Sequence, residues 1–273
     1  MKLGIIGATG RMGQAVIRSA RKFDVRVTAA IVSQYSTRYG EPIYPNPDSA
    51  GVRYQRAAEI QAGQVDVLID FSLPNALSDN VALAQRLGVP IVVCTTGLAA
   101  TQRHLLYTVA QEIPVLYAAN TSVGVTLLRQ LVQLAAAVLP NSDIEIIEAH
   151  HSVKRDGPSG TAIALGESAA AGRGQTLAEV SAGVRGDGIR AAGSIGFAVI
   201  RAADIIGEHT VLLAHAGERI ELTHRVSSRR VFAQGALQAA LWLQQQPAGL
   251  YSMADMLQIE TQLLQLAQGM KPL

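Results

Sequence analysis

The first half of the chain alternates short apolar runs with longer amphipathic stretches. The apolar runs are rich in Val, Ile and Leu, like strands buried in a parallel sheet, and the stretches between them repeat at helical spacing. We predict strands at 2–6, 25–32, 65–72, 90–97 and 114–120, and helices at 11–21, 74–87 and 99–112. Such alternation is typical of a doubly wound parallel sheet, so the predicted fold class is α/β with a Rossmann-like N-terminal part.

The pattern changes after Asn120. One amphipathic helix is predicted at 122–139, and strand-like alternation follows later at 194–202, 209–217 and 219–227. The glycine-containing turn between the last two strands predicts a hairpin, and hairpin connections favour a mixed or antiparallel sheet. We therefore expect a second, α+β domain. Two further helices, at 229–245 and 251–268, are expected to close the chain, and residues 35–60 are expected to form a loop with one short strand.

The composition is that of a globular protein, since 49% of the 273 residues are hydrophobic and 16% are charged. A formal charge of +2 does not favour nucleic acid or an anionic membrane as a partner. The single cysteine, Cys94, excludes an internal disulfide and a cysteine-rich metal site, which fits a cytoplasmic location. No signal peptide is visible, and the longest apolar stretch, 127–139, is too short and too polar to span a bilayer.

Gly7, Gly10 and Gly13 lie between the first strand and the first helix. Glycines at this place permit a tight turn and let the amides at the helix start approach a pyrophosphate, so we expect a dinucleotide there. Thr9 occupies the place of the second glycine of the usual fingerprint. The alternative is a glycine turn that serves only helix–strand packing.

The second strand ends at Val32 and Ser33 without the carboxylate that would bind the ribose hydroxyls of NAD. Arg11, Ser33 and Arg38 could instead bind a 2′-phosphate. We therefore expect NADPH in preference to NADH.

A basic cluster begins at the end of the run DIEIIEAHH, residues 143–151, which follows the helix predicted at 122–139. His150 and Lys154 lie four residues apart, beside His151 and Arg155, and an imidazole there could exchange a proton near pH 7 while the lysine holds an anion. Ser159 or Thr161 is a natural N-cap for the helix that follows, whose free amides form a second anion site. The cluster predicts a small substrate with more than one carboxylate or phosphate; the alternative is a solvated basic loop. No metal site is expected, because adjacent strand residues such as His150 and His151 point to opposite faces.

The run from Glu145 to Ala162, Glu-Ile-x-Glu-x-His-x-x-x-Lys-x-Asp-x-Pro-Ser-Gly-Thr-Ala, resembles the signature of the 4-hydroxy-tetrahydrodipicolinate reductase (dihydrodipicolinate reductase) family. Further blocks resemble that family in the family's order: GATGRMG, DFS.P, TTG, AAN.SVGV, ADIIGEHTV and SSRR.FAQGAL. The likeness therefore extends through most of the chain.

The resemblance implies a reductase of the diaminopimelate and lysine pathway, in which a nicotinamide cofactor delivers hydride to a cyclic dicarboxylate. His150 would be the general acid and Lys154 would hold the substrate, with its carboxylates bound by His151, Lys154, Ser159, Gly160 and Thr161. The cofactor would be bound by Ser33 and by three loops, made of Gly7, Ala8, Thr9, Gly10, Arg11 and Met12, of Cys94, Thr95 and Thr96, and of Ala118, Ala119, Asn120 and Thr121.

The resemblance also implies a homotetramer formed through the second domain. The expected domains are a dinucleotide-binding domain at 1–121, with helices from 231–273 packed back on it, and a substrate-binding and oligomerisation domain at 122–230.

Four positions depart from the family pattern, all on the expected cofactor side: Val32, Leu73, Cys94 and Thr121. Two alternatives to the lysine-pathway reductase stay open on the sequence. One is a paralogue that reduces another cyclic imine dicarboxylate, and the other is a non-catalytic dinucleotide-binding protein.

Overall fold

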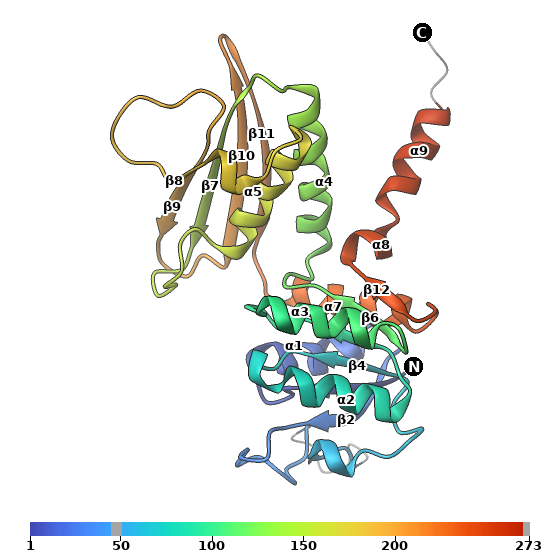
Figure 1. The fold of residues 1–273 in the computed structure, drawn as a ribbon. Coiled ribbons are helices and arrows are strands. Elements are labelled where there is room, and N and C mark those ends of the chain that lie inside the picture. The colour runs from blue at the N-terminus through green and yellow to red at the C-terminus, as the bar shows by residue number, and fades with distance from the viewer. Residues whose placement is uncertain (45–50, 270–273) are drawn as a thin grey trace. The chain divides into compact units, whose positions relative to one another are not determined.

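The computed structural model describes residues 1–44 and 51–269, and the chain divides into two compact units (Figure 1). The first unit contains Met1–Ser122 and Arg229–Leu273, and the second contains Val123–Ser228. The first unit is therefore built from two separate parts of the chain.

The first unit is built on a parallel sheet of seven strands in the order β12-β6-β5-β4-β1-β2-β3. The strands are β1 (Lys2–Ile6), β2 (Arg26–Ile31), β3 (Tyr54–Gln55), β4 (Val67–Asp70), β5 (Ile91–Val93), β6 (Pro114–Tyr117) and β12 (Gly249–Tyr251). Every residue of β4 and β5 is buried, which explains why these strands read as unbroken apolar runs.

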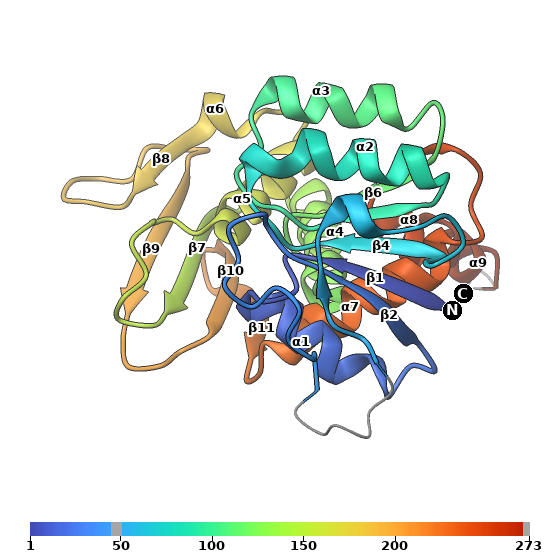
Figure 2. The same ribbon diagram turned by 90° about the horizontal axis from the view of Figure 1, so that it is seen from below.

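Helices cover both faces of this sheet, with α1 (Arg11–Ala20) and α7 (Arg230–Leu243) on one side and α2 (Leu77–Leu87) and α3 (Ala100–Val109) on the other (Figure 2). Two short 3₁₀ turns, η1 (Ala57–Glu59) and η2 (Pro74–Ala76), precede β4 and α2. After β12 the chain forms α8 (Met253–Leu257) and α9 (Ile259–Gly269).

The carboxyl ends of the central strands are aligned. Ile6 at the end of β1 lies opposite Ile31 of β2 on one side and opposite Asp70 of β4 on the other. The chain turns from β1 to β2 in one direction and resumes at β4 in the other, so a topological switch point lies between β1 and β4. Ligands of open parallel sheets bind outside the strand ends at such a point.

The second unit contains a mixed sheet of five strands in the order β11-β10-β7-β9-β8. β7 (Asp143–His150) is parallel to β9 (Ile195–Arg201), which is parallel to β8 (Ser181–Val184), whereas β10 (Gly207–His215) is antiparallel to β7 and to β11 (Glu218–Val226). One face packs on α4 (Val123–Val138) and α5 (Gly160–Gly172), and α6 (Leu177–Val180) precedes β8 (Figure 1).

The predicted fold class is confirmed, and the hairpin is β10–β11. The single helix predicted at 251–268 is wrong: Tyr251 is the last residue of β12, which pairs with β6, and the helix is broken into α8 and α9 at Gln258, where φ is +49°. The 3₁₀ turn at Pro74 delays the predicted second helix to Leu77. In the described residues, no helix combines the length and the hydropathy needed to cross a membrane.

Candidate active site

The three glycines after β1 have three different roles. Gly7 has φ of +75°, and a Cβ there would lie 2.6 Å from the carbonyl oxygen of Phe71, so the loops after β1 and β4 touch at the switch point. A Cβ on Gly13 would lie 2.4 Å from the oxygen of Gly7, so this glycine serves helix–strand packing. Gly10 is exposed and is the N-cap of α1, without a side-chain cap. The start of α1 is thus open to a pyrophosphate, and the loop fits a dinucleotide.

The end of β2 offers hydroxyl and cationic groups. Val32 is buried, whereas Ser33 and Arg11 are exposed. Arg38 donates a 2.8 Å hydrogen bond to Glu41, and its guanidinium lies 4.7 Å from the centroid of the Tyr54 ring.

The carboxyl ends of β4 and β5 meet at a buried aspartate. Asp70 has no exposed surface and accepts hydrogen bonds from the Ser72 amide at 2.8 Å, from Asn80 at 3.1 Å and from the hydroxyl of Thr95 at 3.4 Å. Burial raises the pKa of Asp70, and these neutral donors offset only part of the rise. The hydroxyl of Thr95 is therefore engaged in a hydrogen bond within the protein, whereas the adjacent Thr96 is exposed.

Cys94 is an apolar spacer in this structure. It is buried, and burial, followed by the nearby Asp70, raises its pKa well above the usual value. A thiol held neutral in this way is not nucleophilic.

The loop after β6 is fastened to α7. Thr121 is buried and its hydroxyl donates a 2.7 Å hydrogen bond to the carbonyl oxygen of Phe232. A Cβ on Gly235 would lie 1.8 Å from the oxygen of Thr121, so only glycine fits there. Ala119 is exposed and Ala118 is buried, so this loop can meet a cofactor through its backbone and Ala119, not through the Thr121 hydroxyl.

The second unit carries a chain of charged groups at the end of β7. His150 Nδ1 lies 2.5 Å from Oε2 of Glu148, which has no exposed surface. Arg201 donates to both carboxylate oxygens, at 2.8 and 2.9 Å, and the amide of Ser159 donates to Oε1 at 3.1 Å. Arg201 also donates a 2.6 Å hydrogen bond to the carbonyl oxygen of Asp156.

These partners shift the titration of the buried groups. Burial acts to raise the pKa of Glu148, but the hydrogen bonds from Arg201 and His150 outweigh it and the pKa is lowered. The pKa of His150 is lowered, chiefly by burial. Glu148 offsets part of this shift, whereas the positive charges of Lys154 and Arg201 add to it. A bound dicarboxylate would favour the imidazolium, because it adds negative charge beside the ring.

Lys154 is held by the loop that carries it. Its ammonium donates to both carboxylate oxygens of Asp156 at 2.7 Å, and the Asp156 side chain is 64% exposed. An incoming carboxylate can take the place of this partner, because the displaced Asp156 carboxylate is exposed to water and is not left buried without a partner.

The start of α5 lies beside the same cluster. Ser159 is the N-cap: its buried hydroxyl accepts from the Ala162 amide at 3.2 Å and lies 3.0 Å from Nε2 of His209. The side chain expected to bind a carboxylate is therefore committed inside the protein. Gly160 and Thr161 are the first two residues of the helix, where its positive end can meet an anion.

Two further histidines adjoin the cluster. His209 is buried, its ring lies edge-on to that of His150 with centroids 5.2 Å apart, and burial lowers its pKa to about 4. His151 follows β7; its Nδ1 is enclosed and has no hydrogen-bond partner among residues 1–44 and 51–269.

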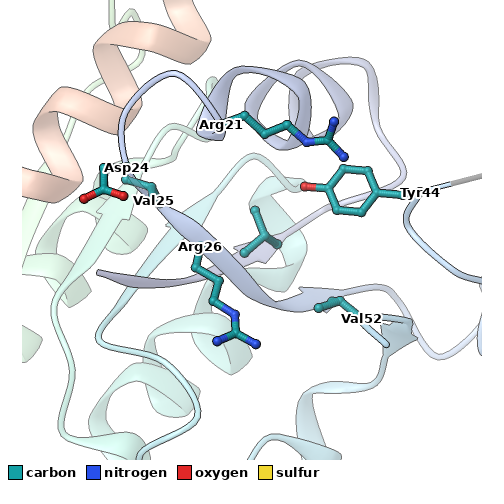
Figure 3. A pocket seen from close by; sticks show the side chains of 7 residues that line it. Arg21, Asp24, Val25, Arg26, Tyr44 and Val52 are labelled. Atoms are coloured by element: carbon teal, nitrogen blue, oxygen red, sulfur yellow. The ribbon is translucent and has the colours of Figure 1, made fainter. Parts of the chain in front are cut away.

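A cavity of about 370 Å³ lies at the opposite end of β2, beside Arg21, Arg26 and Tyr44 (Figure 3). The Arg21 guanidinium lies 4.6 Å from the centroid of the Tyr44 ring. Because this cavity is at the amino end of the strand, it is remote from the glycine loop and is not the candidate site.

Sequence reasoning missed Glu148, Asp156, Arg201, His209 and Asp70. A signal existed for Glu148: residues two apart on a strand share a face, so Glu148 and His150 had to be neighbours. Arg201 could not be found in this way, because its pairing with His150 depends on the parallel register of β7 and β9.

The chain matches two family models, "Dihydrodipicolinate reductase, N-terminus" over residues 1–121 and "Dihydrodipicolinate reductase, C-terminus" over residues 124–257. It is 44% identical over 265 residues to the 4-hydroxy-tetrahydrodipicolinate reductase of Pseudomonas fluorescens (strain SBW25), with 94% of this chain and 99% of that protein covered. It is 45% identical over 260 residues to the enzyme of the same name from Zymomonas mobilis, with 94% and 97% covered.

A solved structure of dipicolinate-bound dihydrodipicolinate reductase from Paenisporosarcina sp. TG-14 has a similar fold, with a TM-score of 0.75 and 22% identity. The match covers 93% of this chain and 98% of that one.

The relatives' shared name and the two family models place the chain in the class of NAD(P)H-dependent oxidoreductases, and the parallel sheet with a glycine loop at its switch point fits that class. Within that class, the chain belongs to the dihydrodipicolinate reductase family.

Proposed function

We propose that this chain reduces 4-hydroxy-tetrahydrodipicolinate to tetrahydrodipicolinate with NAD(P)H, a step of diaminopimelate and lysine biosynthesis. Family membership over nearly the full length supports the reaction, and favours it over a paralogous substrate or a non-catalytic role. The observation that carries it is the arrangement at the end of β7, where an imidazole, a lysine ammonium and a helix start lie on one short segment.

The net reaction adds a hydride and a proton to the substrate and releases its hydroxyl group as water. The bound nicotinamide supplies the hydride. His150 donates the proton from Nε2, because Nδ1 is held by Glu148. Lys154 exchanges Asp156 for a substrate carboxylate, and the positive end of α5 at Gly160 and Thr161 accepts a second carboxylate, beside His151.

The cofactor proposal is NADPH in preference to NADH. It is supported by exposed Ser33 and Arg11 at the end of β2 and the start of α1, and by Arg38, whose anionic partner Glu41 is half-exposed. Replacement of Arg38 by Ala should raise KM for NADPH and leave KM for NADH unchanged. Equal changes for both cofactors would contradict the 2′-phosphate role.

The assembly proposal is a homotetramer formed through the second unit. The face of its sheet turned away from α4 and α5 carries Ile147, Leu212 and Ile200, and Ile200 is 47% exposed. Light scattering on the wild type and on Leu212→Arg tests this, since the arginine should yield smaller species. We place the enzyme in the cytoplasm, where its buried free thiol Cys94 stays reduced.

The reaction is tested by following nicotinamide oxidation with substrate generated in situ by the preceding aldolase. The wild type should turn over, whereas His150→Ala and Lys154→Ala should each lower kcat/KM by about 10²- to 10⁴-fold while remaining folded. Wild-type rates in both variants would overturn the assigned roles, and absence of turnover in a wild type that binds nucleotide would overturn the reaction.

A further inference from the structure

Glu148 and Arg201 form an ion pair where the hydrophobic core of the second unit would otherwise continue. Ile144 and Ile146 lie on the core-facing side of β7, and Glu148 and His150 follow on the same side, because strand side chains alternate. A buried ion pair contributes little net stability compared with apolar residues of similar size. Its presence at the end of a core-facing row therefore points to a role beyond packing.

The carboxylate of Glu148 determines which nitrogen of His150 carries a fixed proton. Arg201 donates to both oxygens of Glu148 and keeps it ionised, so Glu148 can only accept from His150. The 2.5 Å contact therefore requires a hydrogen on Nδ1. Proton exchange with a substrate is left to Nε2.

The neighbouring strand β10 places no side chain against Nε2 of His150 at Gly207. Gly207 lies beside the ring, and a Cβ at that position would be 3.1 Å from Nε2 of His150. Because the φ of Gly207 is not in the left-handed region, backbone conformation does not require glycine here. A Cβ at this position would instead crowd the reactive nitrogen, and the His150 ring would have to move by a few tenths of an ångström.

Arg201 also connects His150 with the loop that carries Lys154. Its guanidinium donates to the carbonyl oxygen of Asp156 as well as to Glu148, and the carboxylate of Asp156 accepts from Lys154. One guanidinium thereby sets the position of both functional side chains through a single intermediate residue each.

We infer that Glu148 and Arg201 are positioning residues for the reductase, which orient His150 so that Nε2 delivers the proton, and that Gly207 keeps this nitrogen open. The inference rests on the proposed function, in which His150 is the proton donor. The proton leaves Nε2 with the bonding electrons remaining on the ring, Nδ1 keeps its hydrogen, Glu148 stays ionised, and solvent reprotonates Nε2 after turnover.

The groups that face His150 come from four elements: Glu148 on its own strand, Lys154 on the following loop, Arg201 on β9 and His209 on β10. Of these, Glu148 alone raises the pKa of His150. A general acid works while protonated, so activity falls as pH rises through its pKa. Loss of the Glu148 charge must therefore move the alkaline fall-off of activity to lower pH.

The experiment compares Glu148→Gln with a matched control, Glu145→Gln. Glu145 lies on the same strand and pairs with Arg185 and Arg190, but on the opposite face and without contact to His150. We expect Glu148→Gln to lower kcat about 10- to 100-fold, with KM changed less than about threefold and the alkaline limb moved to lower pH. Glu145→Gln should keep the wild-type kcat and pH profile. Wild-type kcat and pH profile in a folded Glu148→Gln variant would overturn the inference.

Two further variants keep the test decisive if Glu148→Gln fails to fold. Gly207→Ala leaves every charge in place and should lower kcat about tenfold by crowding Nε2. Arg201→Lys should give a kcat between those of the wild type and Arg201→Met, because it restores charge without the two-pronged geometry. Full activity in both Gly207→Ala and Arg201→Met would contradict the inference.

A direct readout separates this inference from the proposed function. NMR titration of His150 in the folded protein, without substrate, should show hydrogen on Nδ1 in the wild type. The pKa of His150 should be lower in Glu148→Gln than in the wild type. If the wild type does not reduce the substrate but the titration shows this difference, the reaction is wrong and the positioning stands. If the wild type is active and the titration is unchanged, the positioning is wrong.

Discussion

Asp70 and Glu148 are two carboxylates with no exposed surface, one in each unit, and their pKa values move in opposite directions. Burial by itself acts to raise the pKa of each carboxyl group. Asp70 is held by neutral donors from Ser72, Asn80 and Thr95, which do not compensate for burial, whereas Glu148 is held by a guanidinium and an imidazole, which do.

The difference shows that partners, not depth, decide the charge of a buried carboxylate. In the first unit, an aspartate held by dipoles ties the ends of β4 and β5 together beside the expected cofactor. In the second, an ionised glutamate orients the group proposed to donate a proton.

Removal of the guanidinium should be the most damaging change. Arg201→Ala leaves Glu148 buried without its two-pronged partner, and we expect the free energy of unfolding to fall by about 3–5 kcal/mol. Urea unfolding followed by circular dichroism measures it. The matched change, Arg185→Ala, should lower the free energy of unfolding by less than about 1 kcal/mol, because Glu145 is partly exposed and keeps Arg190. Equal losses would contradict the special status of Glu148.

His209 should make the second unit acid-sensitive. Its pKa is lowered from 6.5 to about 4, so the folded state binds fewer protons than the unfolded state between these values. Stability is therefore present above pH 6.5 and is lost as pH falls towards 4, by about 3 kcal/mol at 1.36 kcal/mol per pKa unit. His209→Asn should flatten this part of the curve of unfolding free energy against pH. An unchanged slope would show that groups other than His209 cause the loss of stability in this pH range.

Asp70→Asn and Glu148→Gln should change the pH dependence of stability in opposite senses. Because the pKa of Asp70 is raised in the folded state, the wild type loses stability as pH rises from the unfolded pKa to the folded pKa of this group. The free energy of unfolding of Asp70→Asn, relative to that of the wild type, should therefore rise with pH. Because the pKa of Glu148 is lowered in the folded state, this carboxylate stabilises the fold above its unfolded pKa. The free energy of unfolding of Glu148→Gln, relative to that of the wild type, should therefore fall as pH rises. At neutral pH we expect Asp70→Asn to differ from the wild type by about 1 kcal/mol. Parallel curves for both variants, measured by urea unfolding from pH 3 to 7, would refute the contrast.

The smallest effect is expected at Cys94. Its Sγ makes one weak contact, 3.9 Å from the carbonyl oxygen of Val92, and the thiol is buried. Cys94→Ser should leave kcat unchanged and lower the free energy of unfolding by about 1 kcal/mol. The native thiol should also resist a thiol reagent until the protein unfolds. Rapid labelling of the native protein would show that the site opens.

Much of the fold could be predicted because the spacing of apolar residues and the positions of glycine and proline indicate the same elements along most of the chain. The buried strands β1, β4 and β5 read as apolar runs, and the glycine turn after β1 marked the start of α1. β12 was not predicted, because three residues are too few to show a periodicity and their pairing with β6 is a tertiary contact. The break at Gln258 escaped for a similar reason: a non-glycine residue at positive φ has no signature in the sequence.

The candidate site was predictable in its residue types and not in their contacts. His150 and Lys154 could be selected for their chemistry, and Ser159 is one of the two predicted N-caps. The sequence could not show that Asp156 holds Lys154 or that the Ser159 hydroxyl also lies against His209. The partners Arg201 and His209 come from strands far along the chain and meet β7 only through sheet register.

The discontinuity of the first unit has a consequence during synthesis. β12 and α7, which pair with β6 and pack on β4, β5, β6 and α1, are translated only after the whole of Val123–Ser228. The second unit, being continuous in sequence, can close on the ribosome while the first still lacks its last strand and one covering helix. A chain released early, at residue 228, would expose β6 as an unpaired edge and the sheet face that α7 covers, which makes such fragments natural substrates for chaperones and proteases.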